Sequence, residues 1–298
     1  MADHLVRLIT RDGTLRAVAA ETTLLVEECR HRQQTDPTAT VALGRIATAA
    51  ALMGGLLKGE QRLALIVEGS GPLKRLQAET DAHGRVRATL KVPVADLPPR
   101  DGRFDVAGAV GHAGFLHVIK DLGLKEPYRG MVQLATSEIG DDLATYFATS
   151  EQIPSSVALG VALDHDMRVT AAGGFLLQLL PGGDPALVEQ LEGRLAHLPP
   201  PTTLLRQGVA PTAILERLLD GIPTTPLGQI PLEFACSCSR AQVSGVLRLL
   251  GAAELDEILA EQGEATVTCD FCKEPYRFER EELEAIRAGL SSPAPSGE

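Results

Sequence analysis

Aromatic residues and positive charge are both scarce in this chain of 298 residues. Phe, Trp and Tyr make up 3% of the sequence, and Trp is absent. Lys and Arg number 28 against 39 Asp and Glu, so the formal net charge is −11. A protein surface that binds nucleic acid needs clustered Lys and Arg side chains to displace counterions from the phosphates. A surface that binds single-stranded nucleic acid also needs aromatic rings on which the bases stack. The composition therefore argues against a nucleic-acid partner.

Long hydrophobic runs are also missing. The most apolar stretch, Ile46 to Leu57, is too short to cross a bilayer and predicts a buried core helix instead. The first ten residues, MADHLVRLIT, lack the basic segment and the apolar segment of a signal peptide. We therefore expect a cytoplasmic protein without a membrane partner.

Sequence motifs of the common enzyme classes do not occur in the chain. It contains no phosphate-binding Walker A loop and no G-x-S-x-G nucleophile elbow. His112 and His117 lack the helical spacing of metal ligands and are interpreted as solvated or core residues. Asp141 and Asp142 open a predicted helix, where the positive end of the helix dipole stabilises carboxylates. These residues therefore do not predict an enzyme.

Five cysteines are present, and four of them form two close pairs, Cys236-x-Cys238 and Cys269-x-x-Cys272, separated by 30 residues. In a large cytosolic chain thiols stay reduced, so such pairs are typical of metal sites or redox centres. Two pairs supply the four thiolates of a tetrahedral zinc site, and all seven histidines lie outside this region. We expect one Zn²⁺ per chain and no histidine ligand. The fifth cysteine, Cys29, shares a predicted helix face with apolar residues and is interpreted as a buried, inert thiol.

The residues around the two pairs predict a small folded module. Ser239 and Gln242 fit the N-cap and the third position of a helix, and short strands are expected at Ala265–Thr268 and Tyr276–Phe278. The C-x-x-C pair then lies in the turn between the strands. A module of this size has too small a core to fold alone, so a bound metal would contribute to its stability. Residues 232–290 contain 6 basic and 12 acidic residues, and this net charge of −6 again argues against nucleic acid.

The rest of the chain predicts an α+β fold, with sheet packed on helix. Asp12-Gly13 between two apolar runs indicates a hairpin, and the later runs are separated by Gly- or Pro-bearing turns. Strands are predicted at 4–10, 14–20, 62–68, 73–81, 85–92, 114–120 and 130–135, a further hairpin at 156–180, and helices at 23–33, 38–57 and 140–150.

The composition changes after residue 180, because nine of the 19 prolines fall in residues 181–231. Two short amphipathic stretches in this segment, Leu187–Leu195 and Ile214–Leu219, are marginal as helices without a surface to dock on. The tail from Ser291 to Glu298 is expected to fray. We therefore expect three parts: a core substrate-binding domain at 1–182, a metastable helical linker at 183–231 and a small zinc-binding domain at 232–290.

The segments that contain the paired cysteines are EFACSCSR (233–240) and VTCDFCKEPYRF (267–278). Together with the core segments KDLG (120–123), YFATSEQIP (146–154) and GGFLLQLLP (173–181), they resemble the redox-regulated 33-kilodalton heat-shock chaperone family of bacteria. The resemblance implies a stress-responsive, ATP-independent holdase rather than an enzyme. It also implies that reduced protein holds Zn²⁺ on Cys236, Cys238, Cys269 and Cys272 and is inactive.

Oxidation is the switch that the resemblance implies. Oxidants would convert the four thiolates into two disulfides and expel the metal. The zinc domain and the linker would then unfold, and a surface for unfolding client proteins would open, commonly with formation of a homodimer. Four cysteines permit three pairings. We expect Cys236–Cys238 and Cys269–Cys272, because the members of each pair are adjacent on one turn.

Two other functions remain open at this point. A thiol–disulfide oxidoreductase would use Cys269 and Cys272 as its active pair, although that motif normally begins a helix in a βαβ unit and strands flank it here. A zinc-stabilised adaptor would hold its metal permanently. Catalysed turnover of a small disulfide would favour the first, and zinc retention under peroxide without a gain of client binding would favour the second.

Overall fold

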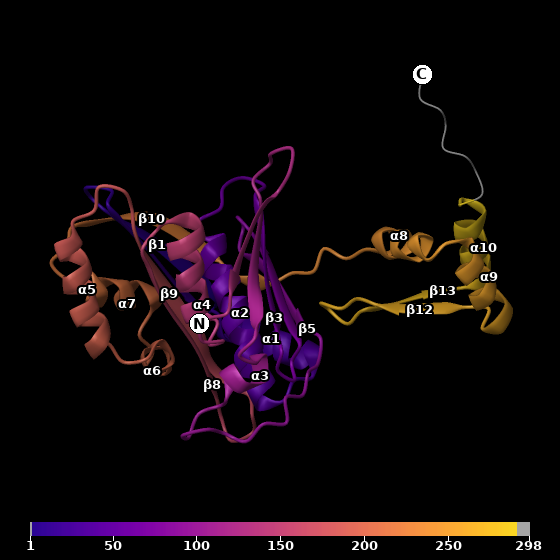
Figure 1. The fold of residues 1–298 in the computed structure, drawn as a ribbon, viewed down its shortest axis with the longest axis horizontal. Coiled ribbons are helices and arrows are strands. Elements are labelled where there is room, and N and C mark those ends of the chain that lie inside the picture. Colours follow the sequence, from indigo (N-terminus) through magenta and orange to yellow (C-terminus); the bar gives the residue numbers. More distant parts are fainter. Residues whose placement is uncertain (1, 291–298) are drawn as a thin grey trace. The chain divides into compact units, whose positions relative to one another are not determined.

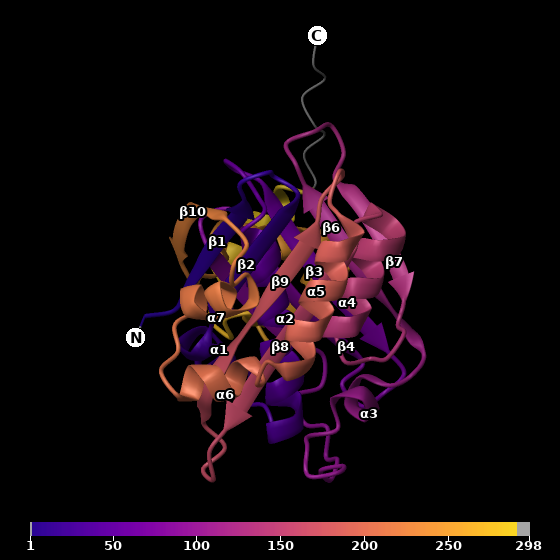
Figure 2. The same cartoon turned by 90° about the vertical axis from the view of Figure 1, so that its left-hand side faces the viewer.

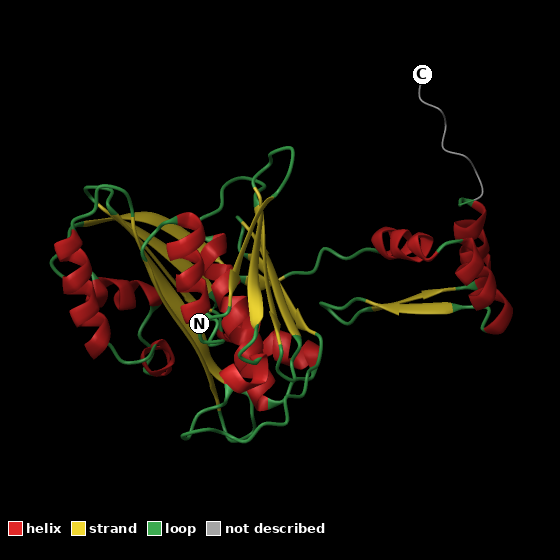
Figure 3. Cartoon of the chain, in the orientation of Figure 1, coloured by secondary structure: helices red, strands yellow, loops and turns green. Residues whose placement is uncertain are grey.

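The structure is a computed structural model that describes residues 2–290, and the tail expected to fray lies outside the described residues. The chain divides into two compact units between Ala235 and Cys236 (Figure 1). The N-terminal unit contains two β-sheets with helices between them, and the C-terminal unit contains a hairpin and three helices (Figure 3). The predicted mixture of sheet and helix is confirmed.

The first sheet of the N-terminal unit has five antiparallel strands in the order β10-β1-β2-β9-β8. Its first hairpin turns at Asp12-Gly13 as predicted, because Gly13 has a φ of +74° and the Asp12 carboxylate accepts a hydrogen bond from the Thr14 amide at 3.1 Å. The strands are β1 (His4–Thr10), β2 (Leu15–Glu21), β8 (Ser155–Leu163), β9 (Val169–Leu179) and β10 (Thr224–Pro231).

The second sheet has six strands in the order β11-β5-β4-β3-β6-β7, antiparallel except that β11 runs parallel to β5. Alternate residues of β3, β4 and β5 are buried, which places one face of the sheet toward the core. The strands are β3 (Arg62–Gly69), β4 (Arg75–Asp81), β5 (Arg85–Leu90), β6 (Gly114–Asp121), β7 (Tyr128–Gln133) and β11 (Glu233–Phe234).

Helices α1 (Thr23–Gln33) and α2 (Pro37–Gly54) lie between the two sheets. Helix α2 begins at the N-cap Asp36, whose carboxylate accepts from the Ala39 amide at 2.7 Å, and it contacts β4 and β5 of one sheet and β8 and β9 of the other. Almost all of its residues are buried, so the apolar run predicted to be a core helix is one. It ends at Gly54 rather than at Leu57.

Asp142 organises the next helical segment. Its carboxylate, which is fully buried, accepts hydrogen bonds from four backbone amides between Ala135 and Ile139 at 2.7–3.2 Å. This confirms a capping role for Asp142. The predicted helix at 140–150 forms as α4 (Gly140–Tyr146) and then as a π-helical turn, η1 (Phe147–Glu151). The short helix α3 (Val106–Val110) was not predicted.

Three short helices cover the outer face of the five-stranded sheet (Figure 2). They are α5 (Pro185–His197), α6 (Pro201–Arg206) and α7 (Pro211–Leu218). Their apolar side chains form a second core with the outward residues of β1, β2 and β9, including Leu204, Ile214 and Leu215, which are at most 2% exposed. The two amphipathic stretches in the sequence therefore form helices that are docked, and α6 is an additional one.

Residues 224–231 differ from the expectation of a purely helical linker. They form β10, which pairs antiparallel with β1 from Thr224 opposite Thr10 to Pro231 opposite His4. The next residues cross to the other sheet, because the Leu232 amide donates to the carbonyl of Asp3 and the Glu233 amide to that of Gly84. The assignment of 183–231 as a metastable linker stays a prediction.

In the C-terminal unit, two helices precede a hairpin and a third follows it. These elements are α8 (Arg240–Leu250), α9 (Ala252–Glu261), β12 (Ala265–Thr268), β13 (Pro275–Phe278) and α10 (Arg280–Ala288). The two strands and α8 agree with the sequence prediction, and α10 was missed. Seven buried apolar residues form the core of the unit: Val243, Leu247, Leu255, Leu259, Phe278, Leu283 and Ile286.

Candidate metal centre

The first cysteine pair lies immediately before α8. Cys238 precedes Ser239, whose hydroxyl accepts a hydrogen bond from the Gln242 amide at 3.3 Å and so caps the helix as predicted. Cys236 stands at the start of the unit, in the extended segment before the cap. The capped helix therefore fixes the direction in which this segment approaches the hairpin.

The second pair lies in the turn that joins β12 to β13. The Cys269 amide donates to the carbonyl of Glu274 at 3.0 Å, and the Lys273 amide donates to the carbonyl of Cys269 at 2.9 Å. Lys273 has a φ of +60°, the left-handed conformation that reverses the chain after Cys272. These bonds close a tight turn that contains both cysteines, and the sequence predicts this position for the pair, between the two strands.

The four sulfur atoms converge, and all of them lie within 4.8 Å of one another. Cys238 Sγ is 3.3 Å from Cys272 Sγ, and Cys236 Sγ is 3.7 Å from Cys269 Sγ. Four thiolates at about 2.3 Å from a central zinc ion would be about 3.8 Å apart along each edge of a tetrahedron. The spacing of the sulfurs therefore fits a single metal ion of that size, bound by all four predicted ligands.

The protonation of the sulfurs also favours a bound cation. Burial raises the pKa of the Cys272 thiol to about 12, against a smaller opposite effect of the Glu274 amide. Burial raises the pKa of Cys238 as well. As free thiols, Cys238 and Cys272 would keep their protons at neutral pH, so a bound cation would be needed to hold them as thiolates. Among the common metals, this soft sulfur donor set suits zinc.

An unpredicted residue, Tyr276 on β13, also contacts the centre. Its hydroxyl oxygen lies 3.1 Å from Cys238 Sγ, and this interaction raises the pKa of the phenol to about 12. Tyr276 is the fourth residue after Cys272 and lies on the strand that returns from the cysteine turn.

Ion pairs brace the framework around the cysteines. The Arg240 guanidinium lies over the Phe278 ring, 4.5 Å from its centre, and bonds both carboxylate oxygens of Glu282. Arg287 of α10 bonds Asp256 of α9 at 2.8 Å. The first pair joins α10 to α8 and the second joins α10 to α9, so α10 is tied to both helices that precede the hairpin.

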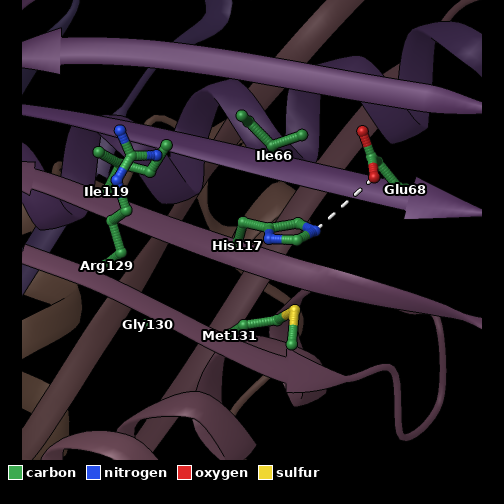
Figure 4. A pocket seen from close by; sticks show the side chains of 7 residues that line it. All are labelled: Ile66, Glu68, His117, Ile119, Arg129, Gly130 and Met131. Carbon is green, nitrogen blue, oxygen red and sulfur yellow. Dashed lines mark ion pairs between the residues drawn. The ribbon is translucent and has the colours of Figure 1, made fainter.

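The other candidate residues lie in the N-terminal unit. Cys29 is fully buried on α1 beside Leu25 and Val26, and burial raises the pKa of its thiol to about 12, as expected of an inert cysteine. His117 on β6 lines a shallow pocket on the outer face of the six-stranded sheet, and its Nε2 is 3.7 Å from a Glu68 carboxylate oxygen (Figure 4). The residues that line this pocket include no Ser, Thr, Cys or Lys.

Comparisons with known proteins agree with this geometry. Residues 3–279 match the family model described as "Hsp33 protein". The chain is 57% identical to the 33 kDa chaperonin of Syntrophotalea carbinolica, over 97% of this chain and 100% of that protein. It is 52% identical to the 33 kDa chaperonin of Geobacter sulfurreducens, over 98% and 97% of the two chains.

A solved structure supports the same relationship. The crystal structure of the 33 kDa chaperonin from Thermotoga maritima superposes with a TM-score of 0.91 at 35% identity, covering 97% of this chain and 99% of the other. The four-cysteine cluster fits the small zinc-binding domain expected from the sequence. Among the described residues, no helix is both long and apolar enough to span a membrane. The family consists of chaperones and not enzymes, and the match over nearly the whole length shows that the chain belongs to the Hsp33 family.

Proposed function

We propose that this chaperone is a redox-regulated, ATP-independent holdase of the cytoplasm. The observation that supports the proposal most directly is the convergence of four cysteine sulfurs within 4.8 Å in a unit whose core, over the residues that the structure describes, has seven buried apolar residues. In reduced protein, one Zn²⁺ per chain is held by Cys236, Cys238, Cys269 and Cys272. A bound zinc ion supplies the positive charge that keeps four thiolates together and ties the segment before α8 to the hairpin.

Oxidation removes the ligands from the metal. In each pair, one thiolate attacks hydrogen peroxide, so that an S–O bond forms, the O–O bond breaks and hydroxide leaves. The second thiolate displaces hydroxide from that sulfur, so that an S–S bond forms and the S–O bond breaks. One peroxide is reduced per disulfide, and the two hydroxides take up two protons to become water. The proposed products are Cys236–Cys238 and Cys269–Cys272.

This exchange destabilises the C-terminal unit. A disulfide that closes such a short loop restricts the unfolded chain little, whereas zinc contributes on the order of 10 kcal/mol or more to small metal-dependent folds. The proposal is that the unit then unfolds together with the linker. Release of α5 and α7 exposes the apolar outer face of β1, β2 and β9, which unfolding client proteins bind, and the oxidised form assembles as a homodimer.

The test measures zinc release and suppression of client aggregation side by side, before and after peroxide, without ATP. We expect one zinc per chain in reduced protein, loss of that zinc on oxidation, and a parallel gain of holdase activity. Disulfide mapping by mass spectrometry tests the pairing, and light scattering tests the dimer. Zinc retained under peroxide with no gain of client binding would instead indicate an adaptor with a structural metal.

Two variants sharpen the test. Cys269→Ser should lose most of the zinc affinity, because a hydroxyl is a poor zinc ligand. Cys29→Ala is the matched control, since it removes a thiol that is buried in the other unit, and it should bind and release zinc like the parent. Full zinc affinity in Cys269→Ser would contradict the ligand assignment. Loss of peroxide activation in a folded Cys29→Ala would show that the fifth cysteine takes part.

A further inference from the structure

Tyr276 stands outside the set of four ligands but contacts one of them. Its hydroxyl oxygen is 3.1 Å from Cys238 Sγ, within hydrogen-bonding distance for sulfur. A metal-bound cysteine is a thiolate and has no proton to donate, so in the loaded site the tyrosine O–H is the donor and the sulfur is the acceptor. The sulfur that Tyr276 contacts is also one of the pair that approach most closely, 3.3 Å from Cys272 Sγ.

The strand fixes the position of this hydroxyl. Tyr276 is paired with Val267 across the hairpin, and its partly buried ring packs against the apolar core of the unit. Two residues further along the same strand, Phe278 is 2% exposed and lies under the Arg240 guanidinium. Since alternate residues of a strand share a face, the packed Phe278 holds the face from which Tyr276 reaches the sulfur. The hydrogen bond therefore costs little additional side-chain entropy.

We propose that Tyr276 is a positioning residue that slows metal loss and oxidation at Cys238, an inference that rests on the proposed redox switch. A donor hydrogen bond withdraws electron density from the sulfur lone pairs. In oxidation those lone pairs form the new S–O bond as the O–O bond of peroxide breaks, so the donor slows that step. Toward the metal, the hydroxyl hydrogen offsets part of the negative charge of the four thiolates and fixes the position of Cys238 Sγ, which favours retention of the ion. Because the hydroxyl holds the sulfur in place and makes it a weaker nucleophile, Tyr276 sets how strong an oxidative stimulus the switch needs.

The test compares Tyr276→Phe with Tyr128→Phe in the full chain. Both remove one phenolic oxygen from a strand, but Tyr128 belongs to β7 of the N-terminal unit, whereas Tyr276 and the four paired cysteines belong to the C-terminal unit. We expect peroxide-driven zinc release about ten times faster in Tyr276→Phe, because a hydrogen bond to a charged group is lost. Zinc affinity measured against a competing chelator should fall about ten-fold, as for other partners of metal ligands. Tyr128→Phe should match the parent in both measurements.

A spectroscopic readout separates this role from general support of the fold. In Co²⁺-loaded protein, the thiolate-to-metal charge-transfer band of Tyr276→Phe should move to lower energy, because the sulfur that lost its donor holds its electrons less tightly. Replacement of tyrosine by 3-fluorotyrosine, a stronger donor of nearly the same shape, should slow zinc release in the parent but not in Tyr276→Phe. This second arm does not depend on the stability of the phenylalanine variant.

Unchanged release rates and an unchanged charge-transfer band in Tyr276→Phe, or a fluorotyrosine effect that persists without Tyr276, would overturn the inference. The proposed function has a separate criterion, since it fails if the parent chain itself does not lose zinc and gain holdase activity under peroxide. A parent that switches normally beside an unaltered Tyr276→Phe would refute only the role of the tyrosine.

Discussion

Removal of the metal from reduced protein should unfold the C-terminal unit and leave the N-terminal unit folded. The core of the C-terminal unit consists of the seven buried apolar residues between Val243 and Ile286, whereas the main core of the N-terminal unit extends over both sheets and α2. The contribution of zinc to a small metal-dependent fold, about 10 kcal/mol or more, is as large as the whole stability of a typical domain, ~5–15 kcal/mol. The free energy lost with the metal is therefore larger than the stability that a core of this size can supply.

The expected signal follows from the helix lengths. Helices α8, α9 and α10 contain 11, 10 and 9 residues, and their ellipticity at 222 nm should disappear when a chelator removes the metal under reducing conditions. The ellipticity of α1 and α2, with 11 and 18 residues, should remain. Among the described residues the four cysteines are the one group placed to hold a metal, so the N-terminal unit has no ligand to lose.

Hydrogen exchange read by mass spectrometry assigns the change to its segment. Amides of residues 240–288 should lose protection on chelation, and those of α2 and the six-stranded sheet should keep it. Readdition of zinc should restore the protection, because the thiols have not been oxidised. Unchanged ellipticity and unchanged exchange in protein shown to be free of metal would refute the reasoning, since the core would then suffice without the metal.

Three further predictions concern the N-terminal unit. Burial raises the pKa of Cys29 to about 12 in folded protein, so as the pH rises the thiol ionises first in the unfolded chain. The free energy of unfolding, measured by urea denaturation, should therefore fall between about pH 9 and 12. The fall should be steeper than in Cys29→Ala by about 1.4 kcal/mol per pH unit. An equal pH dependence in both proteins would show that the thiol is not shielded. Asp142→Ala should lower the free energy of unfolding by about 3 kcal/mol or more, because four backbone amides lose their buried acceptor, and a change below 1 kcal/mol would mean that water replaces it. Amides of residues 183–231 should exchange faster in oxidised than in zinc-bound protein, and equal protection would contradict release of the linker.

The sequence predicted the elements whose signals are local. Alternating apolar residues around Asp12-Gly13 indicated the first hairpin, and the run from Ile46 predicted α2, because burial on all sides leaves few polar positions in a helix. The spacing of the cysteines predicted their convergence for a similar reason. Only the second pair lies on a turn, whereas the first lies in the short extended segment before α8 and not on the turn that was expected for it. The members of each pair are close in sequence, so only the meeting of the two segments depended on tertiary structure.

The missed elements depend on partners elsewhere in the chain. Strand β10 contains Pro226 and Gly228, residues that are typical of a linker. Proline has no amide donor, but this is tolerated in β10 because the strand lies at the edge of its sheet. Helix α10 has few apolar residues, and the local sequence signal for it is the capping pair Glu279 and Glu282 at its start. Tyr276 could not be placed from sequence, since its contact with Cys238 exists only once the hairpin and the segment before α8 have met.

The position of β10 has a consequence for how far a disturbance at the cysteines can spread along the backbone. Between Cys236 and α7 the chain runs through β11, paired with β5, and through the eight residues of β10, paired with β1. The helices α5 to α7 are thus an internal loop, with one end fixed by β9 and the other by β10 in the same sheet. While β10 stays paired, undocked helices remain tethered beside the surface they left, at a high effective concentration for re-docking. Undocking of α5 to α7 alone is then reversible. Lasting exposure of the outer face of the five-stranded sheet requires that β10 also separates from β1.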